Sequence, residues 1–267
     1  MKVVIVQMSS TEDKKRNLNK SLDSINRVAK EKPDLVVFPE YQMFVPDYSK
    51  PEFVKENAET VHGEFISSII AMVARLKLHV LINVSELDKT SFKPFNTSFL
   101  ISDLGIISGR YRKMHLFDAY GMTESCCYEP AHDPAVTMKL NNANIGVQIC
   151  YDLRYPEPSR VLRLQGSHIL VYQAGWFSGN RKLETWKTLL RARAMENGAF
   201  VIGAAQCGPK FTGHSMVVSP YGDVLDEAEN DEVIISTDLD LDLINKYAKD
   251  VALIEHRRRD LYDVSGL

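Results

Sequence analysis

The chain has 267 residues, of which 45% are hydrophobic and 25% are charged, and 32 basic against 35 acidic side chains give a net charge of −3. A chain of this length and composition buries most of its unfolded surface in a large core, which excludes a disordered protein and a disulfide-stabilised miniprotein. The charge is close to neutral and the basic residues form no dominant stripe, which argues against nucleic acid as a partner.

The first third of the chain alternates between strand and helix patterns. A β-branched run at residues 3–6 predicts a buried strand, and apolar residues between 17 and 29 then recur at helical spacing. The same order repeats as a strand at 34–38, an amphipathic helix at 65–76 and a strand at 79–84. Such a βαβαβ series predicts parallel strands joined by right-handed crossovers.

The middle of the chain changes to a hairpin followed by a long loop. Strand patterns at residues 98–101 and 109–113 flank a Leu104-Gly105 turn, which predicts an antiparallel hairpin. Residues 118–135 contain glycine and proline without periodicity, so we expect a long loop there. Loops of this length inside compact domains are commonly functional.

The remaining sequence returns to alternating strand and helix patterns. A strand pattern at residues 144–149 runs into Cys150, and Pro156 fits the first turn of a helix. The later expected elements are a strand at 168–172, a helix at 182–197, and strands at 199–205, 214–219 and 232–237. No linker or repeat interrupts the series, so we expect residues 1–267 to form one domain.

The cysteines and the apolar segments predict a location for the protein. The four cysteines, at 126, 127, 150 and 207, include no Cys-x-x-Cys pair. The opening apolar run is shorter than a signal peptide requires, and no stretch approaches the roughly 18 apolar residues of a membrane span. We therefore expect a cytoplasmic protein with reduced thiols and no membrane partner. The vicinal pair Cys126 and Cys127 is either an oxidation sensor or two ordinary thiols.

Several widespread catalytic motifs are absent from the sequence. It contains no Gly-x-Ser-x-Gly elbow, no phosphate-binding Gly-x-x-x-x-Gly-Lys-Ser/Thr loop, no Gly-x-Gly-x-x-Gly and no His-Glu-x-x-His. Interpretations as a serine hydrolase, an NTPase, a dinucleotide-binding enzyme or a zinc protease therefore lose their basis in the sequence. No spacing of histidine, cysteine and acidic residues suggests a metal site.

Three polar residues follow predicted strands, where α/β proteins place their sites: Glu40, Lys113 and Cys150. A thiol with a pKa of about 8.5 needs a base and a nearby cation to become a thiolate at neutral pH, and Glu40 and Lys113 supply these two groups. Lys113 and the backbone N–H of Tyr151 would also stabilise the oxyanion of a tetrahedral intermediate. The combination predicts acyl transfer, although each residue alone also fits a surface charge or an inert core thiol.

The segments around these three residues resemble the signature segments of the nitrilase superfamily of carbon–nitrogen hydrolases. They cover residues 35–40, 111–117 and 150–157, and the similarity continues at 191–197 and 213–222. The resemblance implies an α/β protein folded as a four-layer α-β-β-α sandwich, with a Glu-Lys-Cys triad and no cofactor. It also implies a homodimer or higher homo-oligomer, with a C-terminal tail from about residue 245 to 267 in the subunit interface.

The resemblance assigns a role to each residue that matches the family pattern. Glu40 becomes the general base, Lys113 the oxyanion stabiliser and Cys150 the nucleophile. A second glutamate is expected between the lysine and the cysteine, and Glu124 matches its surroundings better than the alternative, Glu129. The implied reaction is hydrolysis of a small linear amide to an acid and ammonia through a thioester, with ω-amidase-like specificity.

The residues that follow the nucleophile offer candidates for substrate binding. The segment resembles the ω-amidase branch more than it resembles true nitrilases. Arg154 is a candidate for binding a substrate carboxylate, and its alternative role is a structural ion pair with Asp152 or Glu157. Trp176 and Phe177 are candidates for the apolar wall of a pocket, with packing in the core or in an interface as the alternative.

Three other interpretations of the function stay open at this point. Within the superfamily, the chain is alternatively an N-carbamoyl amine hydrolase or a nitrilase. A Cys-His hydrolase would instead pair Cys150 with His168 or His214. A protein of another class, a catalytically silent binding or scaffold protein, would keep the same fold.

Overall fold

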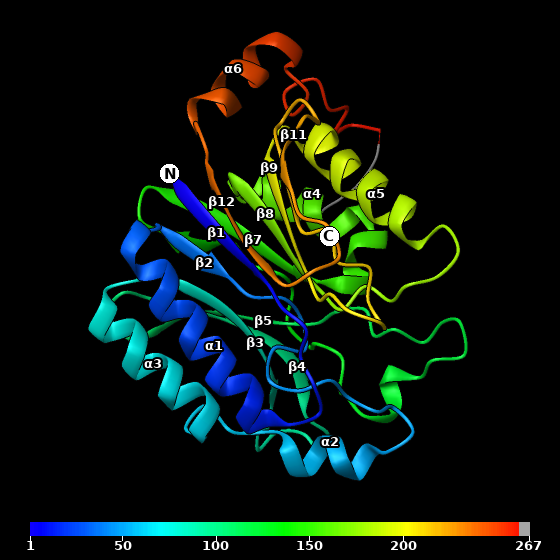
Figure 1. Cartoon of the computed structure of the whole chain (residues 1–267). Coiled ribbons are helices and arrows are strands. Elements are labelled where there is room, and N and C mark those ends of the chain that lie inside the picture. The colour runs from blue at the N-terminus through cyan, green and yellow to red at the C-terminus, as the bar shows by residue number, and fades with distance from the viewer. Residues whose placement is uncertain (262–267) are drawn as a thin grey trace.

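Two six-stranded sheets form the centre of the molecule in a computed structural model that describes residues 1–261 (Figure 1). The first sheet has, in spatial order, β12 (Val233–Asp238), β1 (Lys2–Gln7), β2 (Leu35–Val37), β3 (Val80–Glu86), β4 (Phe95–Ile101) and β5 (Ile107–Arg112). The second sheet has β11 (Val224–Glu227), β10 (Met216–Val218), β9 (Phe200–Ala205), β8 (Ile169–Ala174), β7 (Ala143–Ile149) and β6 (Met138–Leu140). In each sheet three adjacent strands are parallel to one another: β1, β2 and β3 in the first sheet, and β7, β8 and β9 in the second. The other pairings in both sheets are antiparallel.

Helices cover the outer faces of both sheets. The first sheet is covered by α1 (Lys14–Val28) and α3 (Glu64–Leu76), and the second sheet by α4 (Pro156–Leu164) and α5 (Lys182–Asn197) (Figure 1). The remaining helices are α2 (Pro51–Asn57), α6 (Asp242–Val251) and the short η1 (Ala29–Glu31), η2 (Glu124–Cys126) and η3 (Cys150–Arg154). The four-layer α-β-β-α sandwich is therefore confirmed.

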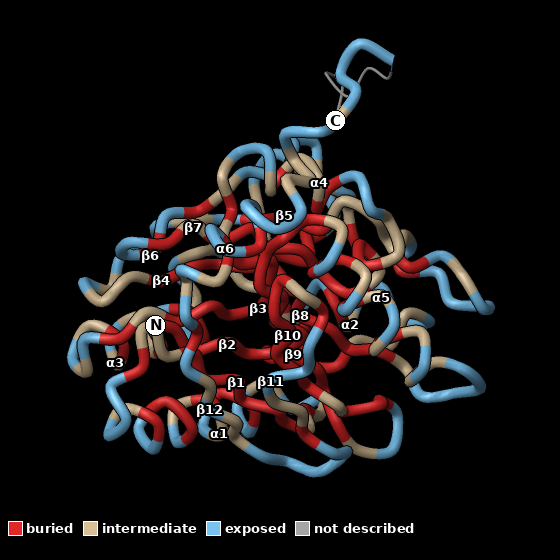
Figure 2. Tube along the Cα trace, turned by 90° about the horizontal axis from the view of Figure 1, so that it is seen from above, coloured by how far each residue is buried: buried red, intermediate tan, exposed pale blue. Residues whose placement is uncertain are grey.

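The apolar runs of the central strands reflect burial on both faces. On β1, Val3 and Ile5 belong to the core between the sheets, whereas Val4 and Val6 pack with the residues of α1 and α3. Successive side chains of a strand point to opposite faces, so a strand covered on both sides has no polar face to present. The buried residues accordingly gather along the strands at the centre, and exposed residues lie at the periphery (Figure 2).

Most of the predicted elements are present, and the structure adds some that were not predicted. The helices, the parallel strands and the antiparallel hairpin of β4 and β5 lie where the sequence pattern predicts them. The prediction missed the helices α2 and α6 and the edge strands β6 and β11. The two strands have three and four residues. A strand of that length is too short for its alternation to be recognised. The expected loop at residues 118–135 contains the short helix η2.

The C-terminal part of the described chain begins with α6, which is anchored on α5. The hydroxyl of Tyr247 donates a hydrogen bond to the carbonyl of Met195 at 2.7 Å, and the Tyr247 ring covers Gly198. Residues 252–261 are partly or fully exposed, and residues 262–267 of the expected interface tail lie outside the described residues. The one-domain organisation, the interface role of the tail, the homo-oligomer and the cytoplasmic location stay predictions. Over residues 1–261 no helix combines the length and apolar character needed to cross a membrane.

Candidate active site

Four strand ends converge between the two sheets. Glu40 follows β2, Lys113 directly follows β5, Cys150 directly follows β7 and Gly175 directly follows β8. Glu40 and Lys113 are 0% and 1% exposed, and Cys150 is 6% exposed. The structure therefore brings together three side chains that stand far apart in the sequence, at the edge where carboxyl ends of strands meet.

The centre of this cluster is a buried ammonium between two carboxylates. The Nζ of Lys113 lies 2.8 Å from Oε1 of Glu40 and 2.8 Å from Oε2 of Glu124. Burial opposes the charge of Lys113, but Glu124 and Glu40 outweigh it and raise the lysine pKa well above its usual value. Burial also raises the pKa of Glu124. The charge of Glu40 raises this pKa as well, whereas the charge of Lys113 lowers it. Lys113 is thus held as a cation beside two acidic groups.

Asn96 connects the two carboxylates and was missed by the sequence analysis. Its Nδ2 donates to Oε1 of Glu40 at 2.8 Å and to Oε1 of Glu124 at 3.1 Å. Asn83 Nδ2 donates to Asn96 Oδ1 at 2.9 Å, which fixes the orientation of the Asn96 amide. Asn96 stands at the start of an antiparallel strand and follows no motif, so no signal in the sequence points to it.

Cys150 stands at a sharp turn between β7 and η3. Its φ of +46° lies in the left-handed region, which costs a residue with a side chain about 1–3 kcal/mol. Asp152 holds this turn, because its Oδ2 accepts hydrogen bonds from the backbone N–H of Ile149 at 2.9 Å and from the hydroxyl of Tyr111 at 2.6 Å. Its Oδ1 accepts from the backbone N–H of His115 at 3.0 Å. A strand that turns sharply into a helix presents a nucleophile at the top of a sheet.

The surroundings of Cys150 favour the protonated form of its thiol. Burial raises its pKa well above the usual value, Glu40 raises it further through its charge and a hydrogen bond, and Lys113 only partly opposes them. The cation that the sequence analysis expected beside the thiol, Lys113, is present, but burial and the charges of Glu40 and Glu124 outweigh its effect on the pKa of Cys150. Attack by this sulfur therefore requires transfer of its proton to the neighbouring Glu40.

A small, narrow pocket opens in front of Cys150. Five aromatic rings and two cations surround the thiol, and the lining residues are Tyr41, Phe117, Cys150, Tyr151, Arg154, Trp176, Phe177 and Lys182. Trp176 and Phe177 therefore lie in a pocket wall, as the sequence analysis proposed. Tyr41 and Lys182 were missed, because a tyrosine with a φ of +59° and a lysine at a helix start have no distinctive pattern.

Arg154 does not form the structural ion pair that was its alternative role. Both oxygens of Asp152 are occupied by other donors, and within residues 1–261 no ion pair joins Arg154 to Asp152 or Glu157. The guanidinium instead lies 5.1 Å from the centre of the Trp176 ring, and its Nε is buried without an acceptor. Arg154 thus faces the pocket rather than a protein carboxylate.

Of the other residues that the sequence analysis named, Tyr151 lies at the site, whereas Glu129 lies outside the lysine cluster. Tyr151 packs its ring edge-on against Phe117, with ring centres 5.1 Å apart, and its backbone N–H follows the cysteine. Glu129 lies 3.6 Å from His132 and contacts no atom of the lysine cluster among the described residues, so the second glutamate of the cluster is Glu124. Cys126 is exposed and Cys127 is buried, and both are free thiols.

The histidines of the Cys-His alternative are engaged elsewhere. Nδ1 of His168 accepts a hydrogen bond from the backbone N–H of Asn144 at 3.0 Å. Nδ1 of His214 lies 2.7 Å from Oε1 of Glu227. Neither histidine lines the pocket of Cys150. The structure therefore does not bring this thiol and an imidazole together.

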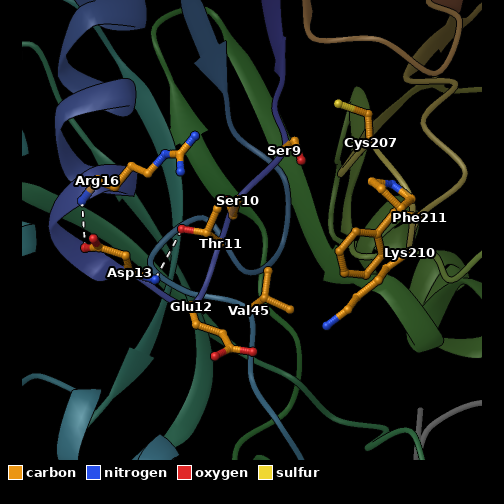
Figure 3. Close-up of a pocket in the computed structure, with 11 residues that line it drawn as sticks. Ser9, Ser10, Thr11, Glu12, Asp13, Arg16, Val45, Cys207, Lys210 and Phe211 are labelled. Carbon is orange, nitrogen blue, oxygen red and sulfur yellow. Dashed lines mark hydrogen bonds between the residues drawn. The ribbon is translucent and has the colours of Figure 1, made fainter.

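A larger surface cleft, with about 980 Å³ of open space, lies beside the candidate site (Figure 3). It reaches from the β1–α1 loop to Cys207, Lys210 and Phe211. Burial is the main cause that raises the pKa of Cys207 to about 12, and none of the residues of the lysine cluster lines this cleft. Phe211 packs against Phe177, with ring centres 5.2 Å apart, and lies between the two spaces. The chemistry therefore belongs to the smaller pocket.

Gly175 is a position where the site leaves no room for a side chain. Its backbone N–H donates to Oε2 of Glu40 at 2.7 Å, and a Cβ there would stand 2.3 Å from Cε2 of Tyr41. We expect Gly175→Ala to move either the Tyr41 ring or the donor of Glu40 and to lower kcat by at least about tenfold. Steady-state kinetics of Gly175→Ala measure this effect, with Gly109→Ala, whose Cβ would meet the flexible side chain of Met138, as a control outside the site. An unchanged kcat in Gly175→Ala would contradict the proposed alignment of Glu40.

Comparison with known proteins assigns the chain to a family. Residues 2–249 match the sequence model of the carbon-nitrogen hydrolase family. The nitrilase and fragile histidine triad fusion protein NitFhit of Drosophila melanogaster is 32% identical over 99% of this chain, which spans only 59% of that protein. Omega-amidase NIT3 of Saccharomyces cerevisiae is 31% identical over 98% of this chain and 94% of its own length. The deaminated glutathione amidase of Escherichia coli O157:H7 is 27% identical over 97% of each chain.

A solved structure supports the same assignment. The NitFhit protein of C. elegans superposes with a TM-score of 0.89 at 26% identity, over 98% of this chain and 66% of that one. The likeness extends over nearly all of the chain in both sequence and structure. The chain belongs to the carbon-nitrogen hydrolase family of the nitrilase superfamily.

Proposed function

We propose that the protein is a thiol amidase that hydrolyses a small linear amide to an acid and ammonia. The observation that carries the proposal is a buried cysteine at a strained turn, beside two carboxylates that share one lysine ammonium. Glu40 acts as the general base, Lys113 stabilises the oxyanion, Cys150 is the nucleophile and Glu124 positions the lysine. These are the groups that acyl transfer by a thiol requires.

The first step forms a bond between sulfur and carbon. Glu40 accepts the proton of the Cys150 thiol as the sulfur attacks the amide carbonyl, and the π electrons of the carbonyl move to its oxygen. Lys113 and the backbone N–H of Tyr151 stabilise the resulting oxyanion. The raised pKa of the thiol supports this order, because a proton that is still on sulfur must leave during attack.

The second step releases ammonia. The oxyanion re-forms its carbonyl as the carbon–nitrogen bond breaks, and Glu40 returns its proton to the departing nitrogen. A thioester between the acyl group and Cys150 remains. Glu124 keeps its hydrogen bonds to Lys113 and to the backbone N–H of Phe117, which holds the ammonium in place throughout.

The third step consumes water. Glu40 takes a proton from a water molecule, the water oxygen attacks the thioester carbonyl, and the second oxyanion rests against Lys113. The carbon–sulfur bond then breaks, the acid leaves, and Glu40 returns the proton to the sulfur. The scheme predicts that ammonia leaves before water enters, with the kinetics of a two-step displacement.

The relatives favour an amide over the other substrates. Two of them are named omega-amidase and deaminated glutathione amidase, and the omega-amidase is matched over nearly its whole length. The alternatives of a nitrilase and an N-carbamoyl amine hydrolase find no such support. ω-Amidase-like specificity, an amide at one end of a short acid, is therefore our proposal for the substrate.

A substrate panel tests the proposal. We expect the wild-type protein to release ammonia from ω-amides of dicarboxylates faster than from N-carbamoyl amino acids, short aliphatic amides or nitriles. A rapid-quench measurement should show a burst of ammonia before the steady release of acid whenever thioester hydrolysis limits turnover. Absence of ammonia release across the whole panel would favour the catalytically silent protein.

A further inference from the structure

Two cations line the same pocket as Cys150. Arg154 ends η3 and Lys182 begins α5, so the two cations come from different elements. The carbonyl of Lys182 accepts a hydrogen bond from Nε1 of Trp176 at 2.8 Å. The start of α5 is thereby tied to the pocket wall, and the base of the Lys182 side chain is held in position.

Neither cation has an anionic partner within residues 1–261. The Nζ of Lys182 lies 3.7 Å from the ring centre of Tyr120 and 5.3 Å from that of Phe117. The guanidinium of Arg154 rests on Trp176, and its Nε is buried without an acceptor. An aromatic face attracts a cation more weakly than a carboxylate does, so both groups keep unused capacity to bind an anion.

The charges in the pocket are distributed unevenly. At the end near Glu40 and Glu124, the carboxylates are already bound to Lys113. Burial lowers the pKa of Lys182 and the charge of Arg154 lowers it further, although Cys150 opposes them. Two like charges that destabilise each other in a partly buried site are stabilised by an anion between them. The pocket thus combines the thiol of Cys150 with two cations that have no anionic partner among residues 1–261.

We propose that Lys182 is a specificity-determining residue that, together with Arg154, binds the carboxylate of a substrate whose amide lies at Cys150. The inference rests on the proposed amidase function and deepens it, because it assigns a second residue to the recognition of the acid end. The ligand is a monoamide of a short dicarboxylic acid. Lys182 leaves its contact with Tyr120 when this carboxylate enters.

The test compares a charged substrate with an uncharged one. We would measure kcat/KM for succinamate and for butyramide in the wild type, Lys182→Met and Lys182→Arg. The loss of one charged hydrogen bond predicts that the ratio of succinamate to butyramide falls by about 10-fold to 100-fold in Lys182→Met, mainly through KM. Lys182→Arg keeps the charge and should retain most of the ratio.

A matched control separates local binding from overall charge. Lys210→Met removes one positive charge from the neighbouring cleft, outside the pocket of Cys150, and should leave the ratio as in the wild type. An equal loss for both substrates in Lys182→Met would mean that Lys182 is only structural. An unchanged ratio would overturn the inference as well.

A binding experiment keeps the inference testable if the amidase function fails. Calorimetry with succinate on Cys150→Ala should show a dissociation constant about tenfold higher when Lys182→Met is added. Lys182-dependent binding of succinate without hydrolysis of any amide would contradict the proposed function and support the anion site. Hydrolysis combined with binding that does not depend on Lys182 would contradict the anion site alone.

Discussion

Cys150→Ala should reduce the turnover of every amide substrate by a factor on the order of 10⁴ or more. Without the sulfur no thioester forms, and neither Glu40 nor Lys113 can replace a covalent nucleophile. The substitution removes a single small atom and keeps a residue with a Cβ at the left-handed turn, so the melting temperature should change little. Ammonia release and a thermal melt of the same preparation measure both effects.

Cys207→Ala is the matched control for this variant. Cys207 is also buried and free, but it faces the larger cleft and lies outside the pocket of Cys150. Its loss should leave turnover close to that of the wild type. Turnover by Cys150→Ala at a rate comparable to that of the wild type would exclude Cys150 as the nucleophile and with it the proposed mechanism.

Lys113→Met should destabilise the folded protein by about 3–5 kcal/mol, besides removing activity. Methionine approximates the length of the lysine, so the main change is the loss of the ammonium between Glu40 and Glu124. The two buried carboxylates then face each other without a cation. The folded state contains either an uncompensated buried charge or a carboxyl group that has taken up an extra proton, and either one lowers its stability. Urea unfolding followed by circular dichroism measures the difference in free energy.

Two further variants identify the cause of this destabilisation. The double variant Lys113→Met with Glu124→Gln removes one of the opposed carboxylates and should regain part of the lost stability without regaining activity. Lys20→Met breaks the partly exposed ion pair with Glu232 and should cost less than about 1 kcal/mol. A Lys113→Met protein as stable as the wild type would show that the buried cluster is not held by the lysine charge.

Much of the fold follows from local pattern in the sequence. The β-branched run of β1 and the helical spacing of α1 each arise from neighbouring residues, so their periodicity is visible before the chain folds. The hairpin of β4 and β5 follows from two strand patterns around a short turn. The edge strands β6 and β11 were missed, because strands of three or four residues are defined by pairing with a neighbouring strand rather than by a pattern of their own.

The residues of the candidate site likewise include some that local sequence pattern reveals and others that it does not reveal. Glu40, Lys113 and Cys150 stand after strands and within recognisable segments, so the sequence alone nominated them. Asn96 was missed, because its contacts join side chains that lie far from it in the chain. Gly175 was missed for the same reason, since the need for glycine there comes from the Tyr41 ring across the sheet edge.

The sequence by itself determined the order of strands and helices, the family resemblance and the identity of the three central polar residues. Only the tertiary structure decided their electrostatics: it raises the pKa of the Cys150 thiol, surrounds Lys113 with two carboxylates and leaves Arg154 and Lys182 without an anion within the described chain. The physical reason is that a pKa and an ion pair depend on burial and on distances between side chains. Those quantities exist only once the two sheets have packed together.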